Sequence, residues 1–250
     1  MLVTVDGIVI GKRDIGENNC FLDVLTDQYG VIEATAHGVK KVNSKNASSA
    51  GLFSYSKFCF NKTNLRYTVN STEPICSFFG LSADLKKFSL AVYLADVIKY
   101  TSASEQSGED ILRFFAITLY KLEKENADCD IIKAAFELRI AAMLGFLPDL
   151  RACRGCGKYV NGKMYFSSEG SDLICEDCKN RENNIYEELK ALLPDLLHTM
   201  RFVVYSASEK VYGFNLKGDT RKEFTAFAEE YLLSQLGRGF KTLDYYKNLA

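Results

Sequence analysis

The sequence predicts an α+β protein in which a small β-barrel comes first and an α-helical domain follows. Three observations support this fold class. Short alternating segments fill the first eighty residues, helical periodicity begins near Leu81, and two Cys-x-x-Cys pairs interrupt the helical part between Cys153 and Cys178. With 250 residues, of which 47% are hydrophobic, the chain is long enough for two buried cores. We therefore expect one domain over residues 1–80 and a second over residues 81–250.

Five segments of the first domain have the two-residue alternation of β-strands. Val3 and Val5 alternate with polar residues, and the phase slips at Gly7 before it resumes, as in a bulged and strongly bent strand. A short connection that ends at Gly30 predicts a hairpin between the second and third segments. Five short strands with a bend in the first predict a closed barrel of the OB kind. The four later segments are residues 21–26, 31–36, 52–60 and 66–71.

The second domain has apolar residues at helical spacing. Ser107 and Asp110 resemble a capping box and predict that a helix over residues 111–122 begins there. The next helix, over residues 130–146, is apolar nearly all round and is expected to be central and buried. Its narrow polar stripe consists of Asp130, Lys133 and Glu137.

Two further helical segments follow the cysteine region. Residues 184–200 have a helical pattern that Pro194 interrupts. Thr220 and Glu223 form a second capping-box pattern, which predicts the start of a last helix that ends at Gly237.

Four of the eight cysteines form a C-x2-C-x18-C-x2-C motif. This spacing is typical of structural zinc, and two expected short strands, residues 163–166 and 171–175, indicate a zinc ribbon inserted at about residues 151–180. Four thiolates fill a tetrahedral shell and leave no position for a reactive water, so the Zn²⁺ is expected to be structural. An iron–sulfur or redox site and metal-free thiols remain alternatives, and a disulfide is disfavoured under reducing conditions. The expected ligands are Cys153, Cys156, Cys175 and Cys178.

The remaining cysteines lie among apolar neighbours and are expected to be buried. They are Cys20, Cys59, Cys76 and Cys129.

The formal net charge of -1 gives no overall attraction to a polyanion, so nucleic acid would have to bind a local patch. Between Ala34 and Thr72 there is no Asp or Glu, whereas six Lys and Arg residues fall in this window. Single surface lysines often serve only solubility, but those of the residue 40–45 loop, together with Lys12 and Arg13, favour phosphate binding. The candidate DNA-binding residues are Lys12, Arg13, Lys40, Lys41, Lys45, Lys57 and Arg66.

Aromatic residues alternate with these cations. Single-stranded nucleic acid binds such a combination, because the cations contact phosphates and the rings stack on bases. The alternative is that the rings fill the barrel, since alternate strand positions point inward. These rings are Phe53, Tyr55, Phe58, Phe60 and Tyr67.

No motif for catalysis is found. His37 and His198 are the two histidines, and neither stands in an H-x-E or H-E-x-x-H frame. The phosphate-binding loop, the dinucleotide fingerprint and the G-x-S-x-G motif are also missing. Arg139 lies nearly opposite the polar stripe of its helix, so it is either paired internally, extended to the surface, or a socket for a partner's carboxylate.

The sequence predicts a cytoplasmic protein. It has no run of 18 apolar residues, and its first residues lack the pattern of a signal peptide. We therefore expect no membrane partner.

The order of these elements is similar to that of a known family. The strings GIVIGKRDIGENNCFLDVLTDQYGVIEATAHGVKKVNSK and FELRIAAMLGFLPDLRAC, with the paired cysteines, resemble the RecO family of bacterial recombination and DNA repair mediators over essentially the whole chain. The resemblance implies an OB-fold, a helical domain with a zinc ribbon, and no catalytic turnover. It also implies binding to single- and double-stranded DNA and the annealing of complementary strands.

The resemblance further implies partners. With RecR, such proteins help to load RecA onto DNA covered by single-strand-binding protein, SSB, and a nucleoid-associated location follows. Carried onto this chain, the socket for the acidic SSB tail would be Arg139. Family members often have arginines where this chain has Lys40 and Lys41, and lysine lacks the bidentate phosphate fork, so weaker or more salt-sensitive DNA binding is expected. The alternative is a zinc-ribbon adaptor for other proteins whose barrel does not bind DNA.

Overall fold

The computed structural model describes most of the chain. Packing divides it into two compact units, the first formed by Met1–Cys129 with Phe240–Ala250 and the second by Asp130–Gly239. No helix in the described part is long and apolar enough to cross a membrane. The described residues are 1–41, 43–64, 66–102, 106–124, 126–160, 162–181 and 188–249.

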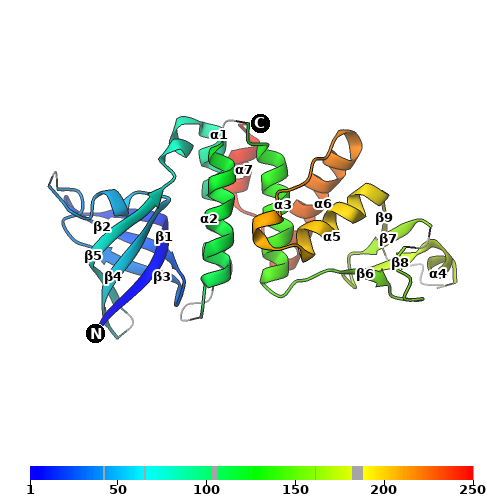
Figure 1. The fold of residues 1–250 in the computed structure, drawn as a ribbon, viewed down its shortest axis with the longest axis horizontal. Helices are drawn as coiled ribbons and strands as arrows, with labels where there is room; N and C mark the ends of the chain where they lie inside the picture. The colour runs from blue at the N-terminus through cyan, green and yellow to red at the C-terminus, as the bar shows by residue number, and fades with distance from the viewer. Residues whose placement is uncertain are drawn as a thin grey trace. The chain divides into compact units, whose positions relative to one another are not determined.

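The first unit begins with a closed five-stranded barrel, so the predicted barrel is observed (Figure 1). The strand order is β1-β2-β3-β5-β4, and β3 pairs with β5 in parallel while the other neighbours are antiparallel. Inward-facing side chains such as Leu22 and Phe58 form its core. The strands are β1 (Leu2–Ile15), β2 (Asn19–Thr26), β3 (Gly30–Ala36), β4 (Ser54–Thr63) and β5 (Arg66–Ser77).

Two glycines shape the barrel, and only one does so as predicted. Gly30 has a φ of 61°, which confirms the tight hairpin between β2 and β3. The register shift of β1 lies between Val9 and Gly11 rather than at Gly7. A Cβ at Gly7 would lie 2.7 Å from Val24 Cγ1, so this glycine serves the close approach of two strands.

Helices of the first unit cover the barrel. Phe53, the residue before β4, packs its ring against Phe88 and Phe115, with distances of 5.9 Å and 6.3 Å between ring centroids. Lys99 Nζ lies 2.6 Å from Oδ2 of the buried Asp23 of β2. The helical elements are η1 (Ser48–Ala50), η2 (Phe79–Ala83), α1 (Leu85–Thr101), α2 (Glu109–Glu123) and α7 (Lys241–Lys247).

The predicted capping box of α2 is wrong. Gly108 is the N-cap and has no side chain to cap with, while the Ser107 hydroxyl donates to Asp27 O at 3.2 Å. Gly108 N–H also donates to Asp27 O, and a Cβ at Gly108 would lie 2.4 Å from Thr26 O. The close contact with the barrel therefore requires glycine at the start of α2.

The second unit combines helices with a four-stranded sheet of order β6-β8-β7-β9. The sheet packs on α6, where the Phe166 ring contacts Phe227 and Tyr231 with centroid distances of 5.0 Å and 5.9 Å. The elements are α3 (Cys129–Met143), β6 (Asp149–Cys153), β7 (Met164–Ser167), β8 (Asp172–Cys175), α4 (Glu176–Arg181), β9 (Leu189–Leu192), α5 (Pro194–Tyr205), η3 (Ser208–Lys210) and α6 (Gly218–Leu236).

Two helix predictions in this unit need correction. The helix expected over residues 184–200 is a strand, β9, followed by α5, which begins at Pro194; residues 184–187 lie outside the described part. Helix α6 has Lys217 as its N-cap, so Thr220 does not open it. Its predicted end is confirmed, because Gly237 adopts a left-handed φ of 64°.

Helix α3 is buried, as predicted, and most of its polar stripe is buried with it. Lys133 is 5% exposed and Glu137 is fully buried. Lys133 Nζ lies 2.9 Å from Glu137 Oε1 and 2.7 Å from Oε2 of Glu229 on α6. Burial opposes the charged form of Lys133, but the two carboxylates outweigh it and raise the pKa of the ammonium.

Candidate metal centre and nucleic-acid interface

The structure brings the four cysteines of the motif together. Their Sγ atoms all lie within 4.8 Å of one another, and Cys156 Sγ is 3.8 Å from Cys175 Sγ. A tetrahedral ion with thiolate bonds of about 2.3 Å requires Sγ–Sγ separations of about 3.8 Å. Four sulfur donors with this spacing could hold one metal ion.

Each cysteine pair lies at the end of a strand of the second unit's sheet. Cys153 ends β6 and Cys175 ends β8, whereas Cys178 lies in α4. Strands β7 and β8 pair in antiparallel register across the turn between Ser167 and Asp172. The two strands predicted between the cysteine pairs are therefore confirmed.

Local backbone geometry favours the thiolate form of Cys153. Gly155 N–H and Cys175 N–H donate to Cys153 Sγ at 3.4 Å and 3.3 Å. Burial alone would raise the pKa of Cys153, but backbone N–H groups of Cys175, Cys156 and Gly155 lower it to about 6. Burial and the neighbouring cysteine sulfurs raise the pKa of Cys178 to about 12. Without an ion, negative charges on sulfurs this close repel one another, and a bound cation offsets that repulsion.

Glycines allow the two cysteine turns to meet. Gly157 has a φ of 70°, as expected for the tight turn after the first pair. A Cβ at Gly155 would lie 2.9 Å from Cys178 Sγ, so only glycine fits between the first turn and this sulfur.

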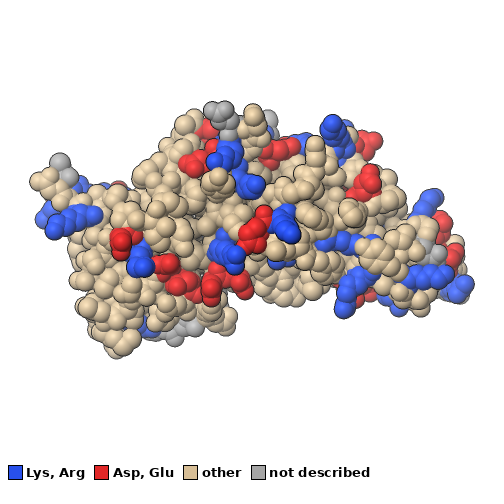
Figure 2. Space-filling model, viewed as in Figure 1, with Lys and Arg blue, Asp and Glu red and all other residues tan. Residues whose placement is uncertain are grey.

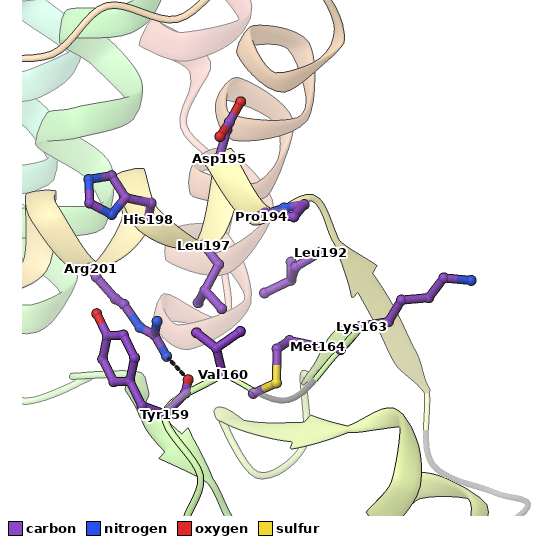
Figure 3. A pocket seen from close by; sticks show the side chains of 11 residues that line it. Tyr159, Val160, Lys163, Met164, Leu192, Pro194, Asp195, Leu197, His198 and Arg201 are labelled. Carbon is purple, nitrogen blue, oxygen red and sulfur yellow. Dashed lines mark hydrogen bonds between the residues drawn. The ribbon is translucent and has the colours of Figure 1, made fainter.

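A cavity of about 380 Å³ lies between the cysteine ribbon and α5. The apolar side chains of Val160, Met164, Leu192 and Leu197 converge on it, while the Lys163 side chain points away (Figure 3). At the same cavity, Arg201 of α5 is 8% exposed and donates to Tyr159 O at 2.7 Å.

Five of the seven predicted DNA-binding residues lie near one end of the barrel. Lys12 and Arg13 stand on the last part of β1, and the other three lie in the loop after β3. Hydrogen bonds join this loop to the β1–β2 turn: Lys40 N–H donates to Asn18 O at 3.2 Å and Gly38 N–H to Asn19 Oδ1 at 2.8 Å. We call this group the rim cations, and its members are Lys12, Arg13, Lys40, Lys41 and Lys45.

The rim cations differ in whether a carboxylate pairs with them. Arg13 pairs with Glu33, and Lys40 Nζ lies 2.7 Å from Asp14 Oδ2. Lys41 and Lys45 are exposed and form no ion pair with any described residue. Figure 2 shows Lys and Arg side chains together at the projecting tip of the barrel, at the upper left, without acidic side chains beside them in this view.

Lys57 and Arg66 lie apart from the rim cations. Lys57 is in the middle of β4, where the register places Asp6 of β1 and Glu73 of β5 at its two sides. These carboxylates reduce the positive potential at Lys57. Arg66 is exposed at the start of β5.

The positions of the aromatic rings favour the alternative prediction, in which the rings fill the interior of the barrel. Phe58, Phe60 and Tyr67 belong to the barrel core, with the first two rings stacked at a centroid distance of 5.3 Å. Phe53 is 1% exposed, while Tyr55 is half-buried. Base stacking on most of these rings would require the core to open.

Arg139 points inward rather than into solvent. Its Nη1 donates to Val204 O of α5, and its Nε is buried. The internal alternative is therefore observed for at least part of this guanidinium.

The scattered cysteines were only partly predicted. Cys20 and Cys129 are buried, and Cys59 is half-buried. Cys76 is exposed near the end of β5, so its prediction is wrong.

Arg201 is the residue that sequence reasoning missed. It follows Leu197 by four positions and precedes Val204 by three, so it lies on the apolar stripe of α5. A single arginine on such a stripe is the signal that could have found it.

Comparison with known proteins gives the class of this chain, which is that of DNA repair proteins. The family models "Recombination protein O N terminal" and "Recombination protein O C terminal" match residues 1–78 and 82–244. The chain belongs to this family, the RecO family, whose members are DNA repair mediators and not enzymes.

Individual relatives agree with this assignment. The chain is 33% identical over 178 residues to the DNA repair protein RecO of Alkaliphilus metalliredigens, covering 71% of this chain and 72% of the relative. It is 26% identical to that of Acetivibrio thermocellus over 97% of this chain and 95% of the relative. It is also 26% identical to that of Bacillus subtilis, over 92% of this chain and 88% of the relative.

Proposed function

We propose that this protein is a DNA-binding recombination mediator that binds and anneals single-stranded DNA. The observation that carries the proposal is the pair of exposed cations, Lys41 and Lys45, that form no ion pair with a described residue at the end of a closed barrel. The barrel is the OB-fold of the proposed nucleic-acid-binding domain, residues 1–80. Because most of its rings are buried, contacts with phosphate rather than base stacking supply the affinity.

The proposal extends to partners. With RecR, the protein helps to load RecA onto DNA covered by SSB, and the acidic tail of SSB binds near Arg139. The family membership of the whole chain supports this role. Annealing of SSB-coated oligonucleotides, with and without RecR, tests it: no acceleration by either protein would remove the mediator role.

We also propose that the cysteine cluster is a structural Zn²⁺ site. Four protein thiolates complete a tetrahedral shell, so the ion would hold the ribbon in shape and would not activate water. Metal analysis should find about one zinc per chain. Iron with visible absorption would replace this proposal with an iron–sulfur centre.

Substitution of the free rim cations tests DNA binding. The double variant Lys41→Gln and Lys45→Gln loses two phosphate contacts, so the slope of log affinity against log salt should become flatter by about 1.4 for single-stranded DNA. Affinity should also fall at each salt concentration. Fluorescence anisotropy with a labelled oligonucleotide measures both quantities.

The matched control changes the net charge by the same amount elsewhere. Lys217 and Lys222 are exposed, lie in the second unit and form no ion pair with a described residue. Their double change to Gln should leave the slope unchanged. If both double variants behave like the unchanged protein, Lys41 and Lys45 do not bind DNA and the proposal loses the observation that carries it; if the unchanged protein binds no oligonucleotide, the adaptor alternative is favoured.

A further inference from the structure

Arg201 is a buried cation that the proposed function does not use. It lies on α5, is 8% exposed and forms no ion pair with any described carboxylate. A buried guanidinium is costly unless its donors are satisfied. The hydrogen-bond acceptors of Arg201 should therefore indicate its structural role.

Its hydrogen bonds to described residues all go to backbone oxygens around the first cysteine pair. Arg201 Nε donates to Leu150 O at 2.7 Å, and Nη2 donates to Tyr159 O at 2.7 Å and Arg151 O at 3.4 Å. The guanidinium also lies 3.7 Å from the centroid of the Tyr159 ring (Figure 3). One side chain thus binds the strand that enters the first cysteine turn and the residue that leaves it.

The turn between these anchor points is tied to β8 at its first residue, where Arg154 N–H donates to Leu173 O at 2.7 Å and Arg154 Nη1 lies 3.2 Å from Asp172 Oδ1. Two backbone hydrogen bonds close it, from Cys153 N–H to Lys158 O at 3.0 Å and from Gly157 N–H to Cys153 O at 2.9 Å. Every residue from Arg154 to Val160 is exposed. The second pair is better packed, because Cys175 and Cys178 are both buried. Arg201 therefore anchors both ends of a turn whose residues are exposed.

We propose that Arg201 is a positioning residue for the metal centre, which it serves by holding the first cysteine turn in its binding geometry before the ion arrives. The inference rests on the proposed metal centre. Fixing the backbone of a residue costs conformational entropy, so a turn that is already ordered binds its ion more tightly. The loaded site would carry four thiolates and one divalent cation, a net charge of about -2, which a buried guanidinium nearby also favours.

Metal affinity is the quantity that tests this role. In the full chain, Arg201→Gln should weaken Zn²⁺ binding by about 10- to 100-fold, the range for residues that support metal ligands. Competition with a chromophoric chelator measures the affinity. Arg201→Lys keeps the charge but lacks the planar fork, so it should recover only part of the loss.

A control variant removes an arginine of the same unit away from the ribbon. Arg221 Nη2 lies 3.1 Å from Asp130 Oδ2, and its partner is on α3. Arg221→Gln should leave Zn²⁺ affinity unchanged. Cobalt-loaded protein gives a second readout, because distortion of the tetrahedral thiolate shell changes its visible absorption spectrum.

Unfolding of loaded and metal-free protein separates positioning from simple structural support. Positioning predicts that the added stability from metal shrinks in Arg201→Gln, by about 1.4 kcal/mol for each tenfold loss of affinity. Equal destabilisation of both forms with unchanged Zn²⁺ affinity would overturn the inference. If the unchanged protein took up no metal, the metal centre itself would be rejected, and the inference with it.

Discussion

At the residue scale, the neighbours of a charge decide what it can do. Lys40, Lys41 and Lys57 look alike in the sequence, and all three fall in its acid-free window. The fold places Asp14 against Lys40, and Asp6 and Glu73 beside Lys57, but leaves Lys41 exposed and unpaired among the described residues. A window in sequence could not reveal this, because the acids come from other strands.

Glycine at position 108 tests how contact with the barrel selects a residue. Gly108→Ala would place a Cβ 2.4 Å from Thr26 O, which the backbone must move to relieve. We expect a loss of about 1–3 kcal/mol in the free energy of unfolding, measured with urea. Gly239→Ala is the control, because nothing lies within 4 Å of its added Cβ. Equal stability of the two variants would contradict the close contact.

The buried cation of α3 gives a second prediction at this scale. Lys133→Met removes the charge between Glu137 and Glu229 and should cost about 3–5 kcal/mol in the free energy of unfolding. Lys190→Met breaks a largely exposed pair with Glu230 and should cost about 0–1 kcal/mol.

The stability that the Lys133 ion pairs add depends on pH in a defined direction. The pKa of Lys133 is raised in the folded protein, so the stability it adds is fully present below the unfolded pKa of about 10.4. That stability is lost only as pH rises through the higher folded value. Urea titrations at neutral and alkaline pH check this; a loss that is complete at neutral pH would contradict the assignment.

At the element scale, local sequence patterns predicted the turns and helix ends that depend on the conformation of a single residue. The β2–β3 hairpin at Gly30, the cysteine turn at Gly157 and the end of α6 at Gly237 all follow from single residues with positive φ. β9 was missed because pairing with β7, which aligns Met164 with Leu192, overrides a helical pattern. The true start of α2 was also missed because a distant contact determines it: the residue at this helix start, Gly108, packs against the barrel.

Metal removal should affect one group of elements and leave another intact. We expect chelation to increase hydrogen exchange in β6 and β8, which end at the proposed ligands Cys153 and Cys175, because binding energy at a structural site is folding energy. Exchange in the barrel strands should not change. Amide exchange by mass spectrometry, before and after chelation, measures both; unchanged protection of β6 and β8 would contradict a structural role.

At the scale of the whole molecule, the sequence predicted the α+β class, the barrel, the cysteine ribbon and the family. The predicted division at residue 80 marks the change from strands to helices. Packing groups α1, α2 and α7 with the barrel, through contacts such as Lys99 with Asp23. Such contacts join residues far apart in the chain, as do those of Arg201 with the cysteine turn, so no local pattern encodes them.

The central claim is that the barrel end binds DNA while the cysteine ribbon supports the second unit. Hydrogen exchange of the full chain with and without a single-stranded oligonucleotide tests it most directly. The claim predicts new protection at residues 10–20 and 37–47, which carry the rim cations, and none at residues 149–178. Protection confined to residues 149–178 would contradict it.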